Sequence, residues 1–297
     1  MSAKILDGKQ LAAEIKADLK LRISKIDTSK KELALGTVLV GDDAGSRKYV
    51  AGKHKDCSEV GIKSINIELP ETAKDFEILQ AVEMLNSDEN CTGYIVQLPL
   101  PRHVNQRRII ESIDPNKDAD GLHPRNLGYL AQNVSGKIAT PLPCTPLGIV
   151  KLMRHYGVKL DGALVAILGR GVTVGRPLSL LLSTKDVNAT VLQAHSGTKD
   201  IKSLTKQADI VISAIGKHGF LTAEHIKDGA VVLDVGVSRV FDETLGRYRV
   251  LGDVAKSVSE KASFISPNPG GVGPMTRAML LENIMQIYSN SSHLLKS

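Results

Sequence analysis

The segment ALVAILGRGVTVGRPLSLLLS, residues 163–183, joins an apolar strand pattern to a helical pattern through a loop that contains glycines. Gly169, Gly171 and Gly175 permit a tight turn and a close approach of a ligand to the backbone, and the first turn of the helix offers N–H groups to a phosphate. The spacing Gly-x-Gly-x-x-x-Gly is one residue longer than the common dinucleotide-binding fingerprint. Turns of this kind also occur without ligands, so the loop by itself leaves nucleotide binding open.

Short apolar segments rich in β-branched residues recur downstream of this loop, at residues 189–194, 209–215 and 230–235. They are typical of central strands in a parallel sheet. A polar hairpin is predicted over residues 240–250, and a last helix over residues 275–288. The second half of the chain is therefore predicted to form a parallel sheet covered by helices.

The first half alternates helix and strand patterns in the same way. Helices are predicted over residues 11–26, 46–60 (with Ser46 as its cap) and 74–85, and strands over residues 34–40, 64–69 and 93–98. This alternation predicts a second parallel sheet, with functional loops beyond the carboxyl ends of its strands. The proline-rich stretch at residues 140–146 separates the halves, and Thr145 is predicted to cap the following helix. The chain is thus predicted to be an α/β protein of two domains.

The end of the strand after the glycine loop distinguishes between two cofactors. An NAD site usually places an acidic residue about 20 residues after the loop, where it binds ribose hydroxyls. Here the strand ends in Gln193-Ala194-His195-Ser196-Gly197, and the next acidic residue is Asp200. Arg170 and Ser196 could instead hold a 2′-phosphate, which favours NADP. For His195, a surface loop position and a direct ligand role remain equal alternatives.

A candidate catalytic pair lies in the first half. Tyr49 and Lys53 are four positions apart on a predicted helix and therefore share one face. A tyrosine can stack on a flat heterocycle, and a lysine in a partly buried cleft can lose its proton and act as a base. An isolated Tyr-x-x-x-Lys is more often a surface pair, so its meaning depends on the segments around it.

Two further segments favour a site. In Val96-Gln97-Leu98-Pro99-Leu100-Pro101, prolines stop strand pairing, and the neutral amide of Gln97 is placed to bind a substrate or to orient Lys53. Asp118-Ala119-Asp120-Gly121 forms an acidic turn. One carboxylate is predicted to bind paired N–H groups of a heterocycle; a metal site, an acid/base pair and a simple Asx turn are the alternatives. Because no His or Cys cluster accompanies the turn, no metal is predicted.

Together these segments resemble the methylenetetrahydrofolate dehydrogenase/cyclohydrolase family, in its short bifunctional bacterial form. The motifs follow the family's order and cover nearly the whole chain. They are Tyr49-x-x-x-Lys53, Val96 to Pro101, Lys117-Asp118-Ala119-Asp120-Gly121, Pro143-Cys144-Thr145-Pro146, Gly169-Arg170-Gly171, Asp234-Val235-Gly236 and Pro269-Gly270-Gly271-Val272-Gly273-Pro274-Met275-Thr276.

The resemblance implies an enzyme with two activities. NADP-dependent oxidation of 5,10-methylenetetrahydrofolate would give the methenyl compound, and hydrolysis would then give 10-formyltetrahydrofolate. It also implies a folate-binding catalytic domain over residues 1–140, an NADP-binding Rossmann domain over residues 141–270, and a C-terminal helix, residues 271–297, that returns to the first domain. The active site is expected in the cleft between the domains, and a homodimer that uses polyglutamylated substrates is expected.

The resemblance further implies individual roles. Lys53 would be the catalytic lysine, assisted by Gln97, with Tyr49 stacking on the folate and Asp120 binding the pterin. Further substrate contacts are expected from Val96, Leu98, Pro269, Gly270, Gly271 and Gly273. Cofactor contacts are expected from Thr145, Gly169, Arg170, Gly171, Ser196 and Val237.

Two positions depart from the family pattern. Gly171 stands where the family commonly has serine, which removes one hydroxyl near the phosphates and bears on the choice between NADP and NAD. Asn268 precedes Pro269 where an apolar residue is usual.

Two other classes of protein share some of these sequence features. A short-chain dehydrogenase also uses Tyr-x-x-x-Lys, but its nucleotide loop comes first, whereas here Tyr49 precedes Gly169. A non-catalytic nucleotide-binding or nucleic-acid-binding protein would be a different class. Lys53, Gln97 and Asp120 argue against a degenerate enzyme, and the lack of a basic run or of any Trp argues against nucleic acid.

The composition predicts an ordinary soluble protein of the cytoplasm. Hydrophobic residues make up 42% and charged residues 24%, with a net charge of +6 spread along the chain. The first twenty residues combine acidic residues with a helical pattern, which fits neither a secretory signal nor a transit peptide. The three cysteines lie far apart and are expected to be reduced thiols.

Overall fold

The computed structural model describes residues 3–27, 32–243 and 246–294. The chain divides into two compact units, each assembled from several segments. The first, here called the six-stranded unit, comprises Met1–Ala12, Leu130–Lys137 and Thr145–Thr276. The second, the three-stranded unit, comprises Ala13–Tyr129, Ile138–Cys144 and Arg277–Ser297.

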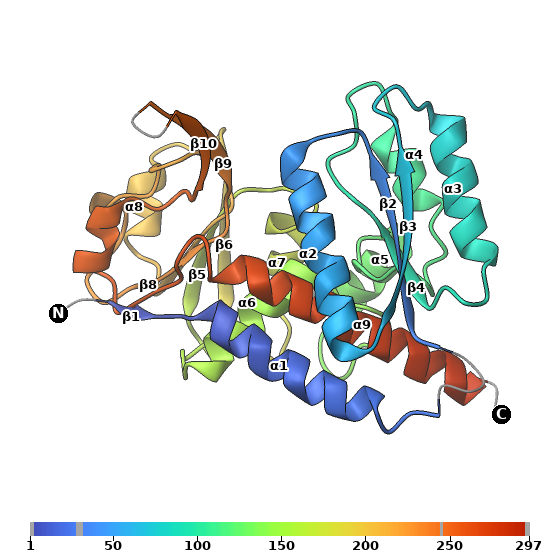
Figure 1. Ribbon diagram of the computed structural model, residues 1–297. Coiled ribbons are helices and arrows are strands. Elements are labelled where there is room, and N and C mark those ends of the chain that lie inside the picture. The colour runs from blue at the N-terminus through green and yellow to red at the C-terminus, as the bar shows by residue number, and fades with distance from the viewer. Residues whose placement is uncertain (1–2, 28–31, 244–245, 295–297) are drawn as a thin grey trace. The chain divides into compact units, whose positions relative to one another are not determined.

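The three-stranded unit is built on a parallel sheet in the order β3-β2-β4. Its strands are β2 (Ala34–Val40), β3 (Lys63–Leu69) and β4 (Gly93–Val96). Every residue of β2 is buried, because β2 has a neighbour on each side and helices α2 (Ala44–Val60) and α3 (Asp75–Ser87) lie on opposite faces of the sheet (Figure 1). The predicted parallel sheet of the first half is confirmed, and the loops after β2 and β4 leave it at the same edge.

The beginning of α2 differs from the prediction. Ser46 was expected to cap the helix, but the cap is Asp43, whose side chain accepts a hydrogen bond from the backbone N of Ser46 at 2.8 Å. A carboxylate three residues before a free N–H is at least as good a cap as a serine, so the helix begins one turn earlier. It ends at Gly61, whose φ of 88° is left-handed.

The six-stranded unit has a parallel sheet in the order β1-β11-β8-β7-β5-β6. The strands are β1 (Lys4–Ile5), β5 (Leu164–Leu168), β6 (Thr190–Ala194), β7 (Ile210–Ser213), β8 (Val231–Asp234) and β11 (Phe264–Ile265). Strand β5 has β6 on one side and β7 on the other, so the direction of winding reverses there. Ligands of doubly wound sheets bind at the carboxyl end of such a reversal, and the loop that follows β5 is the one with the glycines.

Helices α6 (Cys144–His155), α7 (Gly175–Leu182) and α8 (Ile201–Thr205) accompany these strands. Thr145 was predicted to cap α6, but it lies inside the helix, which begins at Cys144. The predicted hairpin is confirmed as β9 (Ser238–Asp242) and β10 (Arg247–Leu251), an antiparallel pair.

The remaining elements are α1 (Gly8–Ile23), α4 (Gln106–Glu111), α5 (Pro124–Gln132), two short 3-10 helices (Ala223–His225 and Lys256–Glu260) and α9 (Val272–Leu294). Helix α9 is longer than the predicted 275–288 at both ends. Among the helices described here, none is long and apolar enough to cross a membrane. The predicted α/β class is confirmed.

Candidate active site

The side chains of Tyr49, Lys53 and Gln97 meet in the three-stranded unit. Lys53 lies on the buried face of α2 and is only 4% exposed. Its Nζ donates a hydrogen bond to Oε1 of Gln97 at 3.0 Å and lies 5.1 Å from the centre of the Tyr49 ring. The predicted pair is therefore a buried amine held between an aromatic face and a neutral amide.

Gln97 is itself held in place. It follows β4 directly, and its backbone N donates to the carbonyl of Val38 at 2.9 Å. Its side-chain Nε2 donates to the carbonyl of Leu98 at 2.6 Å, which leaves Oε1 turned to Lys53. Of the other predicted substrate residues here, Val96 is buried and Leu98 is half-buried.

The surroundings of Lys53 favour its neutral form. Burial lowers the pKa of the Lys53 ammonium, and the guanidinium of Arg277 adds a smaller effect in the same direction. The carboxylate of Asp120 acts in the opposite direction. A lowered pKa increases the fraction of neutral amine, which is the form that can accept a proton.

The two aspartates of the acidic turn have different surroundings. Asp118 is 1% exposed, and its carboxylate accepts hydrogen bonds from the backbone N of Gly121 and His123 and from Nδ2 of Asn126, at 3.1, 2.8 and 2.9 Å. Asp118 therefore holds the turn together. Asp120 is half-buried and acts electrostatically on Lys53, so it is the carboxylate of the turn that belongs with the amine.

Strand β4 and a close backbone contact place this turn. Tyr94 exchanges hydrogen bonds with the segment before and within the turn, from its N to Lys117 O at 2.8 Å and from Ala119 N to its O at 3.1 Å. At Gly121, where φ is 71°, a Cβ would lie 2.4 Å from the carbonyl carbon of Leu142. Only glycine fits there, so the glycine of the acidic motif is required by packing.

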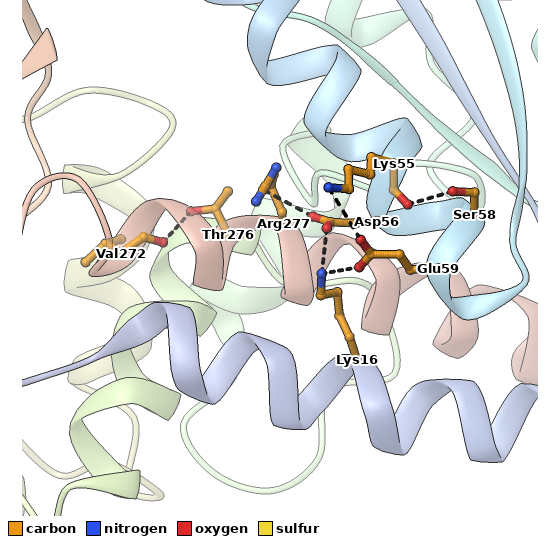
Figure 2. A network of polar contacts seen from close by, with 8 residues as sticks. All are labelled: Lys16, Lys55, Asp56, Ser58, Glu59, Val272, Thr276 and Arg277. Atoms are coloured by element: carbon orange, nitrogen blue, oxygen red, sulfur yellow. Dashed lines mark hydrogen bonds and ion pairs between the residues drawn. The ribbon is translucent and has the colours of Figure 1, made fainter. Parts of the chain in front are cut away.

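An ion-pair network connects α2 with two other helices of the three-stranded unit (Figure 2). Asp56, 4% exposed, accepts from Nζ of Lys16 at 2.7 Å and pairs with Nε of Arg277 at 3.1 Å. A Cβ at Gly52 would lie 2.1 Å from Nη1 of Arg277, so α9 reaches α2 one residue before Lys53. The network thus fixes the helix that carries the amine.

The glycine loop of the six-stranded unit is a tight turn in which close backbone contacts require two of the glycines. At Gly169, with φ of 123°, a Cβ would lie 2.5 Å from Ala214 O, and at Gly175 it would lie 2.3 Å from Gly169 O. A Cβ at Gly171 would meet no described atom within 4 Å, so the serine usual in the family would fit. The first turn of α7 contributes few N–H groups to a ligand, because Arg176 N donates to Gly171 O at 3.1 Å, Leu178 N donates to Val174 O at 2.9 Å and Pro177 has no N–H.

The other predicted cofactor residues lie in the same unit. Arg170, Ser196 and Val237 are exposed. Thr145 shares a hydrogen bond of 2.9 Å with Thr276, between their hydroxyl oxygens. The ring of His195 accepts from the backbone N of Gly197 at 3.1 Å and so closes its own loop. Arg170 follows β5, Ser196 follows β6 and Val237 follows β8, so these three residues lie beyond the carboxyl ends of strands in one parallel sheet, where ligands of such sheets bind.

Two buried carboxylates lie at the ends of β7 and β8: Asp234, which the sequence placed in a family motif without a role, and Asp253, which no motif marked. Asp253 accepts from the backbone N of Ile215 and Lys217 at 2.8 and 2.7 Å, and Asp234 accepts from Asp253 N at 2.8 Å. A Cβ at Gly236 would lie 2.0 Å from Asp253. The Gly252-Asp253 dipeptide was the available signal, but it follows an exposed hairpin and has no pattern of its own.

Asn268, which stands where the family usually has an apolar residue, forms hydrogen bonds that the sequence did not predict. Its Nδ2 donates to Gly236 O at 2.8 Å and to Asp234 Oδ1 at 3.3 Å. The amide therefore ties the loop that contains Pro269 to the end of β8.

The predicted folate residues Pro269, Gly270, Gly271 and Gly273 belong to the six-stranded unit, whereas Tyr49, Lys53, Gln97 and Asp120 belong to the three-stranded one. Gly270 O accepts from Lys9 N at 2.8 Å, and a Cβ at Gly8 would lie 1.8 Å from Gly271 O. The loop is thus packed against the beginning of α1. Among the described residues, no cluster of three or more His, Cys, Asp or Glu side chains could hold a metal ion.

Two family descriptions match this chain. The catalytic domain of tetrahydrofolate dehydrogenase/cyclohydrolase matches residues 6–120, and the NAD(P)-binding domain of the same family matches residues 143–292.

Several solved structures are similar over nearly the whole chain. The bifunctional methylenetetrahydrofolate dehydrogenase/cyclohydrolase of Campylobacter jejuni is 42% identical, with a TM-score of 0.89 over 98% of this chain and 100% of its own. The Trypanosoma brucei enzyme, solved with NADP cofactor and inhibitor, is 36% identical, with a TM-score of 0.93 over 98% and 99%. The bifunctional Thermoplasma acidophilum enzyme is 32% identical, with a TM-score of 0.86 over 98% and 100%. With both domain descriptions matched and the resemblance seen in the motifs confirmed, the chain belongs to the tetrahydrofolate dehydrogenase/cyclohydrolase family.

Proposed function

We propose that this protein oxidises 5,10-methylenetetrahydrofolate with NADP and then hydrolyses the 5,10-methenyl product to 10-formyltetrahydrofolate. The observation that carries the proposal is the buried amine of Lys53, bonded to Gln97 and covered by the Tyr49 ring, in a chain of this family. Family membership favours this function over the short-chain dehydrogenase and over a non-catalytic binding protein.

The residues of the glycine loop fit NADP. Gly169 and Gly175 allow the close backbone contacts that shape this tight loop, and a pyrophosphate would lie beside it at the carboxyl end of β5. Arg170 and Ser196 would hold the 2′-phosphate, and Thr145, Gly171 and Val237 would complete the contacts. Bound NADP supplies the acceptor for the hydride that leaves the methylene carbon.

The three-stranded unit supplies positioning and a base. Tyr49 would stack on the folate, and Asp120 would accept hydrogen bonds from the N–H groups of the pterin. In the hydrolytic step, the oxygen of water bonds to the cationic methenyl carbon while Nζ of Lys53 accepts a proton from that water. Gln97 keeps Nζ in place because it accepts one of its protons. The hydroxyl then loses its proton as the carbon–oxygen double bond forms, the bond from this carbon to the ring nitrogen breaks and that nitrogen gains a proton, so the formyl group remains on the other nitrogen.

The proposal also covers the roles of the domains, the cellular location and the oligomeric state. We assign folate binding to residues 1–140, NADP binding to residues 141–270, and a helix that returns to the first domain to residues 271–297. The thiols of Cys57, Cys91 and Cys144, all within the described residues, are buried and form no disulfide, which suits the cytoplasm. We expect a homodimer that acts on polyglutamylated substrates and supplies formyl groups for purine biosynthesis.

A spectrophotometric assay tests the proposal. Methylenetetrahydrofolate is supplied with NADP or with NAD, and reduced nicotinamide is followed together with the methenyl chromophore. The expected result is faster reduction of NADP than of NAD, with a methenyl signal that rises and then decays. A protein that reduces neither nicotinamide with this substrate would overturn the assignment.

A further inference from the structure

A buried amide on α9 lies against the acidic turn. Asn283 is 1% exposed, and its Nδ2 donates to two backbone carbonyls, Ala119 O at 2.9 Å and Leu142 O at 2.8 Å. It also lies 3.4 Å from Sγ of Cys144. All of these atoms belong to the three-stranded unit.

The two carbonyls belong to segments that pack backbone to backbone. The N of Cys144 donates to Asp120 O at 3.3 Å, and its thiol donates to Ala119 O at 3.4 Å. Gly121 approaches Leu142 so closely that no side chain fits between them. The Asn283 amide is bonded to both segments, so it fixes the distance between them, and these two hydrogen bonds are called the Asn283 clamp below.

Asp118 and Asn283 hold the turn at different points. The Asp118 carboxylate bonds to Gly121, the last residue of the turn, and to His123 after it, and so shapes the turn internally. The Asn283 amide bonds to Ala119, the residue directly before Asp120, and so anchors the turn to the neighbouring chain segment.

We propose that Asn283 is a positioning residue that sets the place of the Asp120 carboxylate and thereby the binding of the folate. This inference rests on the proposed function, in which Asp120 binds the pterin. Loss of the amide leaves Ala119 O with only the weak thiol donor of Cys144 and takes a donor from Leu142 O, so the turn is expected to move toward stronger donors. Asp120 is the next residue and moves with it.

Helix α9 offers a matched control one turn later. Gln286 is also an amide on this helix, and its Nε2 donates to Ala139 O at 2.9 Å and Thr140 O at 3.3 Å. These carbonyls precede Leu142 on the same segment, but they do not belong to the acidic turn. Gln286→Ala therefore removes a comparable helix-to-loop contact and leaves the anchor of Asp120 intact.

The first experiment compares the kinetics of Asn283→Ala and Gln286→Ala in the full-length protein. Asn283→Ala is expected to raise the KM for methylenetetrahydrofolate about tenfold and to leave the KM for NADP within about twofold. Gln286→Ala is expected to change neither KM by more than about twofold. Equal folate KM values in the two variants, or an NADP KM that rises as much as the folate KM, would overturn the proposal.

A milder variant covers the case in which Asn283→Ala does not fold. Cys144→Ala removes only the thiol that shares Ala119 O with the amide. We expect a rise of about twofold to threefold in the folate KM with the NADP KM unchanged. A folate KM equal to that of the wild type would contradict the clamp.

Hydrogen exchange separates this inference from the proposed function. In Asn283→Ala, the backbone amides of Gly121 and Cys144 are expected to exchange faster than in Gln286→Ala, whether or not the protein is active on folate. If the wild-type protein fails the spectrophotometric assay but the exchange difference is present, the function is wrong and the clamp stands. Equal exchange rates in both variants would show that the Asn283 clamp does not hold the turn.

Discussion

Lys53 is the residue on which the hydrolytic step depends. Methionine has a similar length and no amine, so Lys53→Met is expected to lower the cyclohydrolase rate by about 100-fold or more. The decay of the methenyl chromophore measures this directly. Lys55→Met is the control, because Lys55 lies on the same helix with its side chain 77% exposed. Full cyclohydrolase activity in Lys53→Met would remove this amine from the mechanism.

The pH dependence of hydrolysis should report the charge of Lys53. Burial lowers its pKa below 10.5, and the amine must be neutral to accept a proton, so the rate is expected to fall as the pH falls through that pKa. Asp120 opposes the effect of burial, and its replacement in Asp120→Asn removes a charge that raises the pKa of Lys53. The acid limb of the cyclohydrolase pH-rate profile is therefore expected at lower pH in the variant. A limb displaced to higher pH would contradict this electrostatic account.

Spacing in the sequence was enough to predict some contacts of the candidate site, but other contacts could not be predicted from it. Tyr49 and Lys53 share a helix face because of their spacing, and Gln97 meets them because it ends the neighbouring strand. The acidic motif contains two aspartates, and only the fold shows that Asp118 bonds inward. Asn283 acts on carbonyls far away in the chain, and no local pattern marks such a contact.

At the scale of elements, the Asp56 network holds α1, α2 and α9 of the three-stranded unit together (Figure 2). Asp56→Asn is expected to lower the stability by about 2 kcal/mol, less than for a fully buried pair because Lys16 and Arg277 keep some contact with water. Thermal unfolding measures the loss. Glu59→Gln is the control: its carboxylate binds the same Lys16 at 2.6 Å, but its side chain is 42% exposed. A loss as large in the control as in Asp56→Asn would show that burial of Asp56 adds nothing.

Elements with a full period of apolar residues were predictable, and very short ones were not. Strand β2 has the predicted bounds because seven consecutive buried residues leave no ambiguity. Strands β1 and β11 have two residues each and exist only because they pair with each other and with β8. Helix α9 begins earlier than predicted. Its first turn contains glycine and proline, and their low helix propensity led the prediction to start the helix after them. A proline in the first turn costs little, since its missing N–H has no partner there in any case.

At the scale of the whole molecule, the larger sheet contains strands that lie far apart in the sequence. Strand β1 lies near the beginning, and its partner β11 comes after the hairpin, so the sheet closes only when distant parts of the chain have folded. The binding site at this sheet exists only when the sheet has formed, so a ligand that binds there binds the folded state alone. Such a ligand stabilises the native state by mass action. At a concentration one hundred times its dissociation constant, a ligand contributes about 2.7 kcal/mol, which corresponds to a rise in Tm of about 5–10 °C.

NADP is expected to produce this rise in the wild-type protein, and Gly175→Ala is expected to abolish most of it. The added Cβ would lie 2.3 Å from Gly169 O, so the loop must open where the pyrophosphate would bind. Gly128→Ala makes the same chemical change on α5, where a Cβ meets no described atom within 4 Å, and it should keep the full NADP-dependent rise.

Thermal unfolding with and without NADP compares the three proteins. Because each protein serves as its own reference, a direct effect of the substitution on stability cancels, and only the change in binding remains. Equal NADP-dependent shifts in Gly175→Ala and Gly128→Ala would mean that the cofactor does not bind at the glycine loop.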